Sequence, residues 1–167
     1  GWFKNIITDI GLDRLGNSTT SIFTWASIGT GTNAPATTDT SLQAFTASSS
    51  TVTIDSQSNG GPSGYVATCQ LHHVYAQGAV VGNMAEVGIG WATGGGSLWS
   101  RARILDGGGS PTTLTVTSID QLTVYYELSC TPDTTDLVST VVISGVTYDY
   151  TGGANVFDNL TLAIDNM

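Results

Sequence analysis

The stretch Ile22–Leu42, IFTWASIGTGTNAPATTDTSL, is the one around which the rest of the chain is organised. It begins with an apolar run typical of a strand, turns at Gly29-Thr30-Gly31, and continues as a loop rich in Pro, Thr and Asp. The residues alone predict one strand and an ordered loop. Neither this stretch nor any other supplies a catalytic constellation. We therefore expect a structural or interaction protein, not an enzyme, with no catalytic residue and no cofactor.

The composition indicates a single β-rich domain. A chain of 167 residues has room for one core that buries roughly 70% of the surface of the unfolded chain. Glycine accounts for 21 residues and only 10% of the residues are charged. Helix formers are therefore scarce, whereas turn and strand formers are abundant.

The charge balance excludes some classes of partner. The chain has 4 basic and 13 acidic residues, for a net charge of -9, whereas nucleic-acid binding depends on Lys and Arg that neutralise phosphates. The sequence has no apolar run of about 18 residues that could span a membrane, and its first residues lack the pattern of a signal peptide. We expect a mature, soluble chain with neither a nucleic-acid nor a membrane partner.

Residues 1–16 differ from everything that follows. Apolar residues recur there at the three- and four-residue spacing of an amphipathic helix. One interpretation is a helix that closes one end of the core, and the other is an arm that docks on another subunit, since so apolar a segment needs a cover. We accordingly divide the chain into an N-terminal helix or docking arm, residues 1–16, and a single β domain, residues 17–167. The candidate docking residues are Trp2, Phe3, Ile6, Ile7 and Ile10.

Strand and turn signals dominate from Ser21 onward. In residues 65–75, alternation places Ala67, Cys69, Leu71, His73 and Tyr75 on one face. A hairpin is predicted in the last third, where residues 137–143 return as 146–150 around Ser144-Gly145. Eight or nine short strands at near-regular spacing predict an all-β fold, an antiparallel β-sandwich of jelly-roll or immunoglobulin-like type with a short N-terminal helix or arm. The other expected strands lie at residues 42–45, 51–55, 85–92, 98–105, 114–116, 121–130 and 159–164.

The potential metal ligands do not form a convincing site. His72 and His73 are neighbours on a predicted strand and point to opposite faces, while Cys69 and His73 share a face but leave a metal two ligands short. The Asp133–Asp136 run lacks the ligand spacing of an EF-hand, although an irregular calcium site stays open. We predict no metal. Cys69 and Cys130 are interpreted as buried thiols, with a single bridge as the alternative.

The aromatic residues offer one further possibility. Trp25, Trp91 and Trp99, together with several tyrosines, could line a sugar-binding face. Alternating aromatic residues in strands more often belong to a core or a subunit interface. A carbohydrate-binding β-sandwich is therefore a distant alternative, and a glycan partner is possible but unsupported.

Several stretches resemble a known group of proteins. In order, these are NIITDIGLDRLG, IGTGTNAPATTDTSL, AEVGIGWA, LWSRARIL and QLTVYYEL, which span residues 5–128. The pattern GTGT-x-AP-x-x-TDT-x-L and the L-x-SRA strand resemble small virion proteins of tailed bacteriophages, in particular the N-terminal modules of tail-fibre and collar proteins.

This resemblance implies a structural role in the virion. The expected function is that of a neck, collar or tail subunit, acting in assembly or as an adaptor for fibre attachment, with a capsid decoration (cement) protein as the alternative. Other virion proteins would be its partners, the chain would form a homo-oligomer, and it would be located in the virion, assembled in the host bacterial cytoplasm. The loop from Gly29 to Thr40 is then either a contact surface or an intramolecular connection. Its candidate contact residues are Gly29, Gly31, Pro35 and Asp39.

Overall fold

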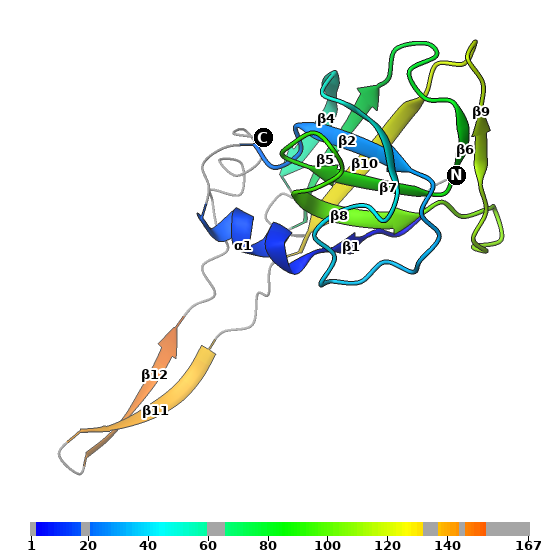
Figure 1. Ribbon diagram of the computed structural model, residues 1–167. Helices are drawn as coiled ribbons and strands as arrows, with labels where there is room; N and C mark the ends of the chain where they lie inside the picture. The colour runs from blue at the N-terminus through cyan, green and yellow to red at the C-terminus, as the bar shows by residue number, and fades with distance from the viewer. Residues whose placement is uncertain (1–2, 18–20, 60–65, 132–136, 144–145, 153–167) are drawn as a thin grey trace.

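The computed structural model describes residues 3–17, 21–59, 66–131, 137–143 and 146–152. Within them the chain is mostly β, with antiparallel sheets that pack together (Figure 1), so the all-β prediction is confirmed. The described part contains one helix, α1 (Asp9–Asn17). No helix in the described part is long and apolar enough to cross a membrane.

Two sheets build the body of the molecule. The first has the strand order β1-β8-β7-β2-β3 and the second the order β10-β5-β4. All of their pairings are antiparallel. The strands of the first sheet are β1 (Ile6–Ile7), β2 (Trp25–Gly29), β3 (Phe45–Ser49), β7 (Glu86–Gly90) and β8 (Leu98–Arg103). Those of the second are β4 (Val52–Asn59), β5 (Ala67–Val74) and β10 (Thr123–Cys130).

Two smaller pairs complete the strands. β6 (Gly82–Met84) pairs with β9 (Leu114–Val116), and β11 (Leu137–Ile143) pairs with β12 (Val146–Gly152). The latter pair confirms the predicted hairpin. It stands away from the two packed sheets, beyond α1 (Figure 1). The strand predicted at residues 159–164 lies outside the described residues.

The core lies between the two sheets. β5 alternates as predicted, since Ala67, Cys69, Leu71 and His73 are buried while the residues between them are half-buried. From the first sheet, Trp99 packs against Phe23 with ring centroids 5.3 Å apart. The Trp99 indole Nε1 donates a hydrogen bond of 2.7 Å to the hydroxyl of Tyr126 in β10. An aromatic contact of this kind adds to the burial of apolar surface that holds the sheets together.

The N-terminal segment departs from the predicted helical stripe. Ile6 and Ile7 form strand β1 and pair with Ser100 and Arg101 of β8, and the helix begins only at Asp9. The reason is Thr8, whose Oγ1 accepts a hydrogen bond of 3.1 Å from the N–H of Gly11 and so caps the helix. The apolar spacing at residues 2–10 predicted one stripe of a helix, and that prediction was wrong for the residues before Asp9.

Strand β4 is longer than its sequence indicates. The strand was expected at residues 51–55, but residues 56–59 continue the pairing with β5 beyond a register shift between Ile54 and Ser56. β4 is an edge strand, and such a bulge interrupts the row of backbone groups that an edge offers to other chains.

Candidate functional site

The described N-terminal candidate residues are half-buried and lie on different elements: Ile6 and Ile7 form β1 of the first sheet, Phe3 precedes it and Ile10 belongs to α1. Trp2 lies outside the described residues. The segment is fixed by backbone contacts on both sides, because the Thr8 N–H donates to the Trp99 carbonyl at 3.0 Å and the Asp9 N–H to the Thr37 carbonyl at 2.7 Å. The residues that carry the docking hypothesis thus also contribute to the packing of their own domain.

A buried carboxylate anchors the loop that follows β2, residues 30–44, here named the anchored loop. Glu86 of β7 is fully buried. Its Oε1 accepts hydrogen bonds from the N–H groups of Gly31 at 3.1 Å and Ala44 at 2.7 Å, and its Oε2 accepts one from Gln43 at 3.1 Å. One side chain therefore holds both ends of the loop.

Arg101 connects this carboxylate to the middle of the same loop. The guanidinium, which is 2% exposed, lies 2.8 Å from Glu86 Oε2 through Nη2 and 2.6 Å from Asp39 Oδ2 through Nη1. It also donates to the Asn33 carbonyl at 3.3 Å. A buried charge is tolerated only when it is paired and hydrogen-bonded, and here both conditions are met. We call Asp39, Glu86 and Arg101 the charge cluster.

Asp39 also shapes the loop locally. Its Oδ2 accepts a hydrogen bond of 2.8 Å from the Ala36 N–H. Burial alone would raise the pKa of Asp39, but this hydrogen bond and the Arg101 guanidinium together hold the pKa below its ordinary value. Asp39 thus contributes to the fold of the loop and is only half-buried.

Positions 29 and 31 require glycine because neighbouring atoms approach the backbone too closely to leave room for a Cβ. Neither has the positive φ that favours glycine. A Cβ on Gly29 would meet the Ala44 carbonyl oxygen at 2.3 Å, and one on Gly31 would meet Glu86 Oε1 at 2.3 Å. Both glycines are buried, whereas Pro35 is half-buried. The exposed surface of the loop consists of their neighbours, among them Thr32, Asn33 and Thr38.

Among the aromatic residues whose side chains the structure describes, no single exposed platform is formed. Trp99 and Tyr126 belong to the core, so Trp99 is not presented to a sugar. Trp91 is half-buried and has the Arg14 guanidinium 5.0 Å from its ring centroid. Tyr125, by contrast, is 62% exposed on the outer face of β10, with its ring centroid 5.4 Å from that of His72.

The two histidines point to opposite faces, as strand alternation predicts. His72 Nδ1 lies 2.7 Å from Asp55 Oδ1 on the outer face of the second sheet. His73 is fully buried, and neither of its ring nitrogens has a hydrogen-bond partner. Burial lowers the pKa of His73 to about 4, although nearby backbone groups of Ser49 and Phe23 partly oppose this effect. In the part of the chain that the structure describes, no three His, Cys, Asp or Glu residues are placed to hold a metal ion.

Both cysteines are free thiols. Cys69 lies opposite Leu128 and Cys130 lies opposite Ala67 on the paired strands β5 and β10. Burial raises the pKa of the Cys69 thiol, which reduces its thiolate character and hence its reactivity.

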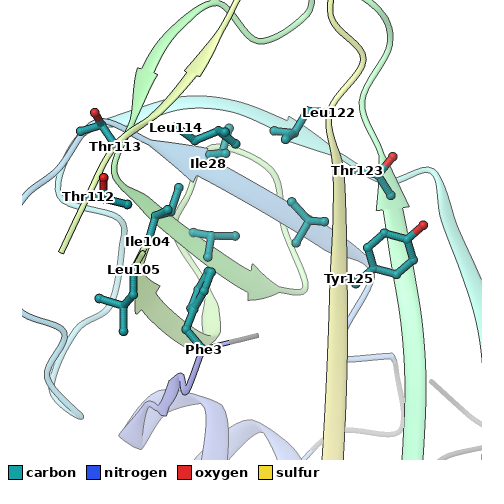
Figure 2. A pocket seen from close by; sticks show the side chains of 12 residues that line it. Phe3, Ile28, Ile104, Leu105, Thr112, Thr113, Leu114, Leu122, Thr123 and Tyr125 are labelled. Carbon is teal, nitrogen blue, oxygen red and sulfur yellow. The ribbon is translucent and has the colours of Figure 1, made fainter. Parts of the chain in front are cut away.

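An apolar groove of about 650 Å³ runs between β10 and the face formed by β2, β7 and the end of β8 (Figure 2). Phe3 reaches into it from the N-terminal segment, and Ile28 and Val87 lie on the first sheet. Its volume is within the range of ligand-binding clefts. No charged residue lines it; the other lining residues are Ile104, Leu105, Thr112, Thr113, Leu114, Leu122, Thr123, Val124 and Tyr125.

Neither the charge cluster nor the groove was recognised in the sequence. For the charge cluster, the available signal was a Glu and an Arg at interior positions of two neighbouring apolar strands, AEVGIG and LWSRAR. For the groove there was no signal, because its lining residues look like ordinary core residues. Comparisons with protein-family models, with curated proteins and with solved structures found no match.

Proposed function

We propose that the chain is a non-enzymatic structural protein of a bacteriophage virion, an assembly or fibre-attachment subunit of the neck, collar or tail. One observation carries the proposal. Three of the stretches on which the phage resemblance rests supply one residue each to the charge cluster: Asp39 from TDTSL, Glu86 from AEVGIG and Arg101 from SRA. The resemblance therefore concerns residues that act together in space.

The charge cluster suits a loop that serves as a contact surface. A buried ion pair adds little net stability compared with apolar packing. In this proposal, its main effect is to hold the anchored loop in a single conformation. A loop held in one conformation loses less entropy when it docks. Its exposed residues are uncharged threonines and alanines with Asn33, Ser41 and Gln43. The polar ones among them can form hydrogen bonds with a partner at a smaller desolvation cost than charged side chains.

The proposal extends to the architecture and the setting. The two antiparallel sheets and the core between them are the basis for proposing a β-sandwich of jelly-roll or immunoglobulin-like type. Other virion proteins and further copies of the chain are its partners in this account, and it resides in the assembled particle.

Quantitative mass spectrometry of purified particles tests the function. We expect wild-type chain at a fixed ratio to the major capsid protein, and at least a tenfold lower ratio for the loop variant Thr38→Arg. Gln121→Arg is the matched control, because Gln121 is also exposed in a loop but lies outside the anchored loop. Complete particles that lack the wild-type chain would contradict the proposal.

A further inference from the structure

Strand β10 lies at an open edge of the second sheet. In the part of the chain that the structure describes, β10 pairs with β5 on one side, and the strand order β10-β5-β4 places no strand on its other side. Its register with β5 is continuous from Thr123 to Cys130, whereas β4, at the opposite edge, is interrupted by a register shift. β10 contains no proline and no basic residue, and Glu127 is its one charged residue. It therefore lacks most of the features that keep an exposed edge from pairing with another chain.

The hydrogen bonds of β10 show which residues face this open edge. The Tyr75 N–H donates to the Leu122 carbonyl at 2.9 Å, so Leu122 directs its backbone groups toward β5. Backbone groups alternate between the two sides of an antiparallel strand. Thr123, Tyr125 and Glu127 therefore direct their N–H and C=O groups away from β5, where the described part of the chain places no strand. An extended segment that lies along this edge finds donors and acceptors already in line.

The groove lies along the same open side of β10 (Figure 2). Among the described residues, those that line the groove come from β10, the first sheet, the N-terminal segment and residues 104–114, and none belongs to β5. A smaller cavity of about 90 Å³ continues along β10 as far as Glu127 and shares Phe3 and Val87 with the groove. Together the two cavities accompany residues 122–127, which extend over roughly 17 Å at about 3.3 Å per residue. A strand added to β10 would run beside this apolar lining.

The inward side chains of β10 are incompletely covered where the groove opens. Leu122 and Val124 pack against the core but are only half-buried, whereas Tyr126, the next inward residue, is buried. Strands of one sheet share its two faces, and successive side chains of each strand alternate between them. Every second side chain of an added strand would therefore enter the groove, and an apolar side chain there would cover Leu122 and Val124.

The occupant has to be an extended segment whose inward side chains are not already in use. The β10 strand of a second copy does not meet this condition. Its Tyr126 is 5% exposed and accepts a hydrogen bond from Trp99 in its own core, so it cannot turn into the groove of another molecule. The geometry thus favours a segment that is not part of a packed sheet before it binds.

Charge adds a second condition on the occupant. The groove has no charged lining residue, Glu127 borders the smaller cavity, and the chain has a net charge of -9. An acidic segment would be repelled, whereas basic residues at its ends would be attracted. The partner that fits is an extended, uncharged or basic segment with apolar residues at alternate positions.

We propose that β10 binds such a segment of another protein as an added strand, with every second side chain of the segment in the groove. In this mode of recognition, main-chain hydrogen bonds supply affinity and pockets for alternate side chains supply specificity. The inference goes beyond the proposed function, because β10 and the groove form a different surface from the anchored loop. A peptide site there does not depend on a role in the virion.

Selection from a library of random peptides displayed on yeast tests the site on the full-length chain. Peptides of about ten residues are long enough to span residues 122–127. We expect the enriched sequences to carry apolar residues at alternate positions, with neither proline nor acidic residues among them. Enriched sequences with apolar residues at helical spacing, or no enrichment relative to selection without the chain, would overturn the inference.

Two substitutions at one position isolate the backbone of the open edge. Tyr125→Pro removes the outward N–H and leaves the hydrogen bonds to β5, since an edge strand tolerates proline where its N–H faces outward. Tyr125→Ala removes the same side chain but keeps the N–H. The most enriched peptide should bind Tyr125→Pro at least tenfold more weakly than Tyr125→Ala in fluorescence anisotropy. Equal affinities would contradict pairing at this edge.

A second pair of variants tests the groove. Leu114→Glu places a charge in it at a position that is 42% exposed, and the matched control is Ile119→Glu, which is 76% exposed and does not line the groove. The first substitution should weaken binding of the same peptide at least tenfold, and the second should leave it within twofold of wild type. If both variants bind as wild type does, the peptide does not use the groove and the inference is wrong.

Amide hydrogen exchange in the wild-type chain tests the same contact without any substitution. Bound peptide should slow exchange at Tyr125 and Glu127 at least tenfold, because their N–H groups become hydrogen-bonded. Val124, which faces β5, is the internal reference. Unchanged exchange at Tyr125 and Glu127 would overturn the inference. So would self-association of the wild-type chain that Tyr125→Pro abolishes in sedimentation velocity, because the edge would then pair with a second copy.

These outcomes separate the inference from the proposed function. A chain that enters particles at a fixed ratio but fails the peptide tests retains the function and loses the inference. A chain that binds peptides through β10 and the groove but is absent from particles shows the opposite.

Discussion

At the scale of single residues, the shape of the anchored loop depends on the acceptors available to its backbone N–H groups and to the buried guanidinium of Arg101 in β8. Glu86 supplies acceptors to three N–H groups and to Arg101. Glu86→Gln keeps the shape of the side chain but removes its charge, which leaves the half-buried Asp39 as the one carboxylate of the charge cluster paired with Arg101. We expect a loss of roughly 3–5 kcal/mol in the free energy of unfolding, measured by urea denaturation.

The control for this substitution is Glu127→Gln on the exposed face of β10, where Glu127 accepts one hydrogen bond from Gln70. Its effect should stay below about 1 kcal/mol. Equal effects of the two substitutions would show that the charge cluster has no special role.

Gly31 gives a second test of the same loop. Because a Cβ there would lie 2.3 Å from Glu86 Oε1 and 2.5 Å from Gln43 Cβ, Gly31→Ala should cost roughly 1–3 kcal/mol through overpacking. Gly107→Ala meets nothing within 4 Å and serves as the control in the same thermal unfolding experiment. A neutral Gly31→Ala would mean that the loop adapts easily and is not held in one shape.

His73 makes the fold sensitive to mild acid. Its folded pKa is about 4 against an ordinary value of 6.5, so below pH 6.5 the unfolded chain binds a proton that the folded chain does not. Stability is therefore complete above pH 6.5 and falls as the pH approaches 4. Between pH 7 and pH 5 the loss should be about 2 kcal/mol.

The comparison of wild type with His73→Leu isolates this contribution, since leucine does not titrate. The variant should lose most of the pH dependence between pH 7 and pH 5, whereas His72→Gln should retain it. An unchanged slope in His73→Leu would assign the acid sensitivity to other groups.

At the scale of elements, the N-terminal segment is joined to β8 through Thr8. The Thr8 hydroxyl donates to the Leu98 carbonyl at 2.5 Å and accepts from the Gly11 N–H, so it both caps α1 and ties it to the sheet. Thr8→Ala should destabilise the chain by roughly 1–2 kcal/mol, and Thr8→Ser should recover most of this loss. The free energy of unfolding of both variants is measured by chemical denaturation. If Thr8→Ser is as unstable as Thr8→Ala, the hydroxyl group is unimportant.

The sequence predicts those elements that are formed by interactions between residues close together in the chain. Alternation identified the buried face of β5, and the turn residues Ser144-Gly145 identified the β11–β12 hairpin, because both signals are local. The helical spacing at residues 2–10 was misleading, since Ile6 and Ile7 gain backbone hydrogen bonds from β8, which is more than ninety residues away. Tertiary pairing of this kind overrides local spacing.

The candidate sites were harder to predict for the same reason. Gly29, Gly31 and Asp39 were selected from their stretch, but Gly31 is required by the approach of Glu86, which lies 55 residues away, and Gly29 by the approach of the Ala44 carbonyl. The groove depends on how the start of β10 sits over the first sheet. No pattern within a single segment encodes either arrangement.

At the scale of the whole molecule, the distribution of charge and apolar surface favours assembly. The chain is strongly acidic, yet no charged residue lines its groove and Asp39 is the only charged residue of its anchored loop. In the proposed assembly role, repulsion between acidic copies leaves these uncharged surfaces as the favoured contacts, and bound partners would stabilise the folded chain by mass action. These properties suit a subunit of a symmetric particle.

Electron cryomicroscopy of intact particles tests the central claim, the structural role in the virion, most directly. The account predicts that density matching the two packed sheets lies in the neck, collar or tail in several symmetry-related copies, with the anchored loop at a contact with a neighbouring protein. Particles without such density would contradict the claim, and density confined to the outer capsid surface would support the decoration alternative.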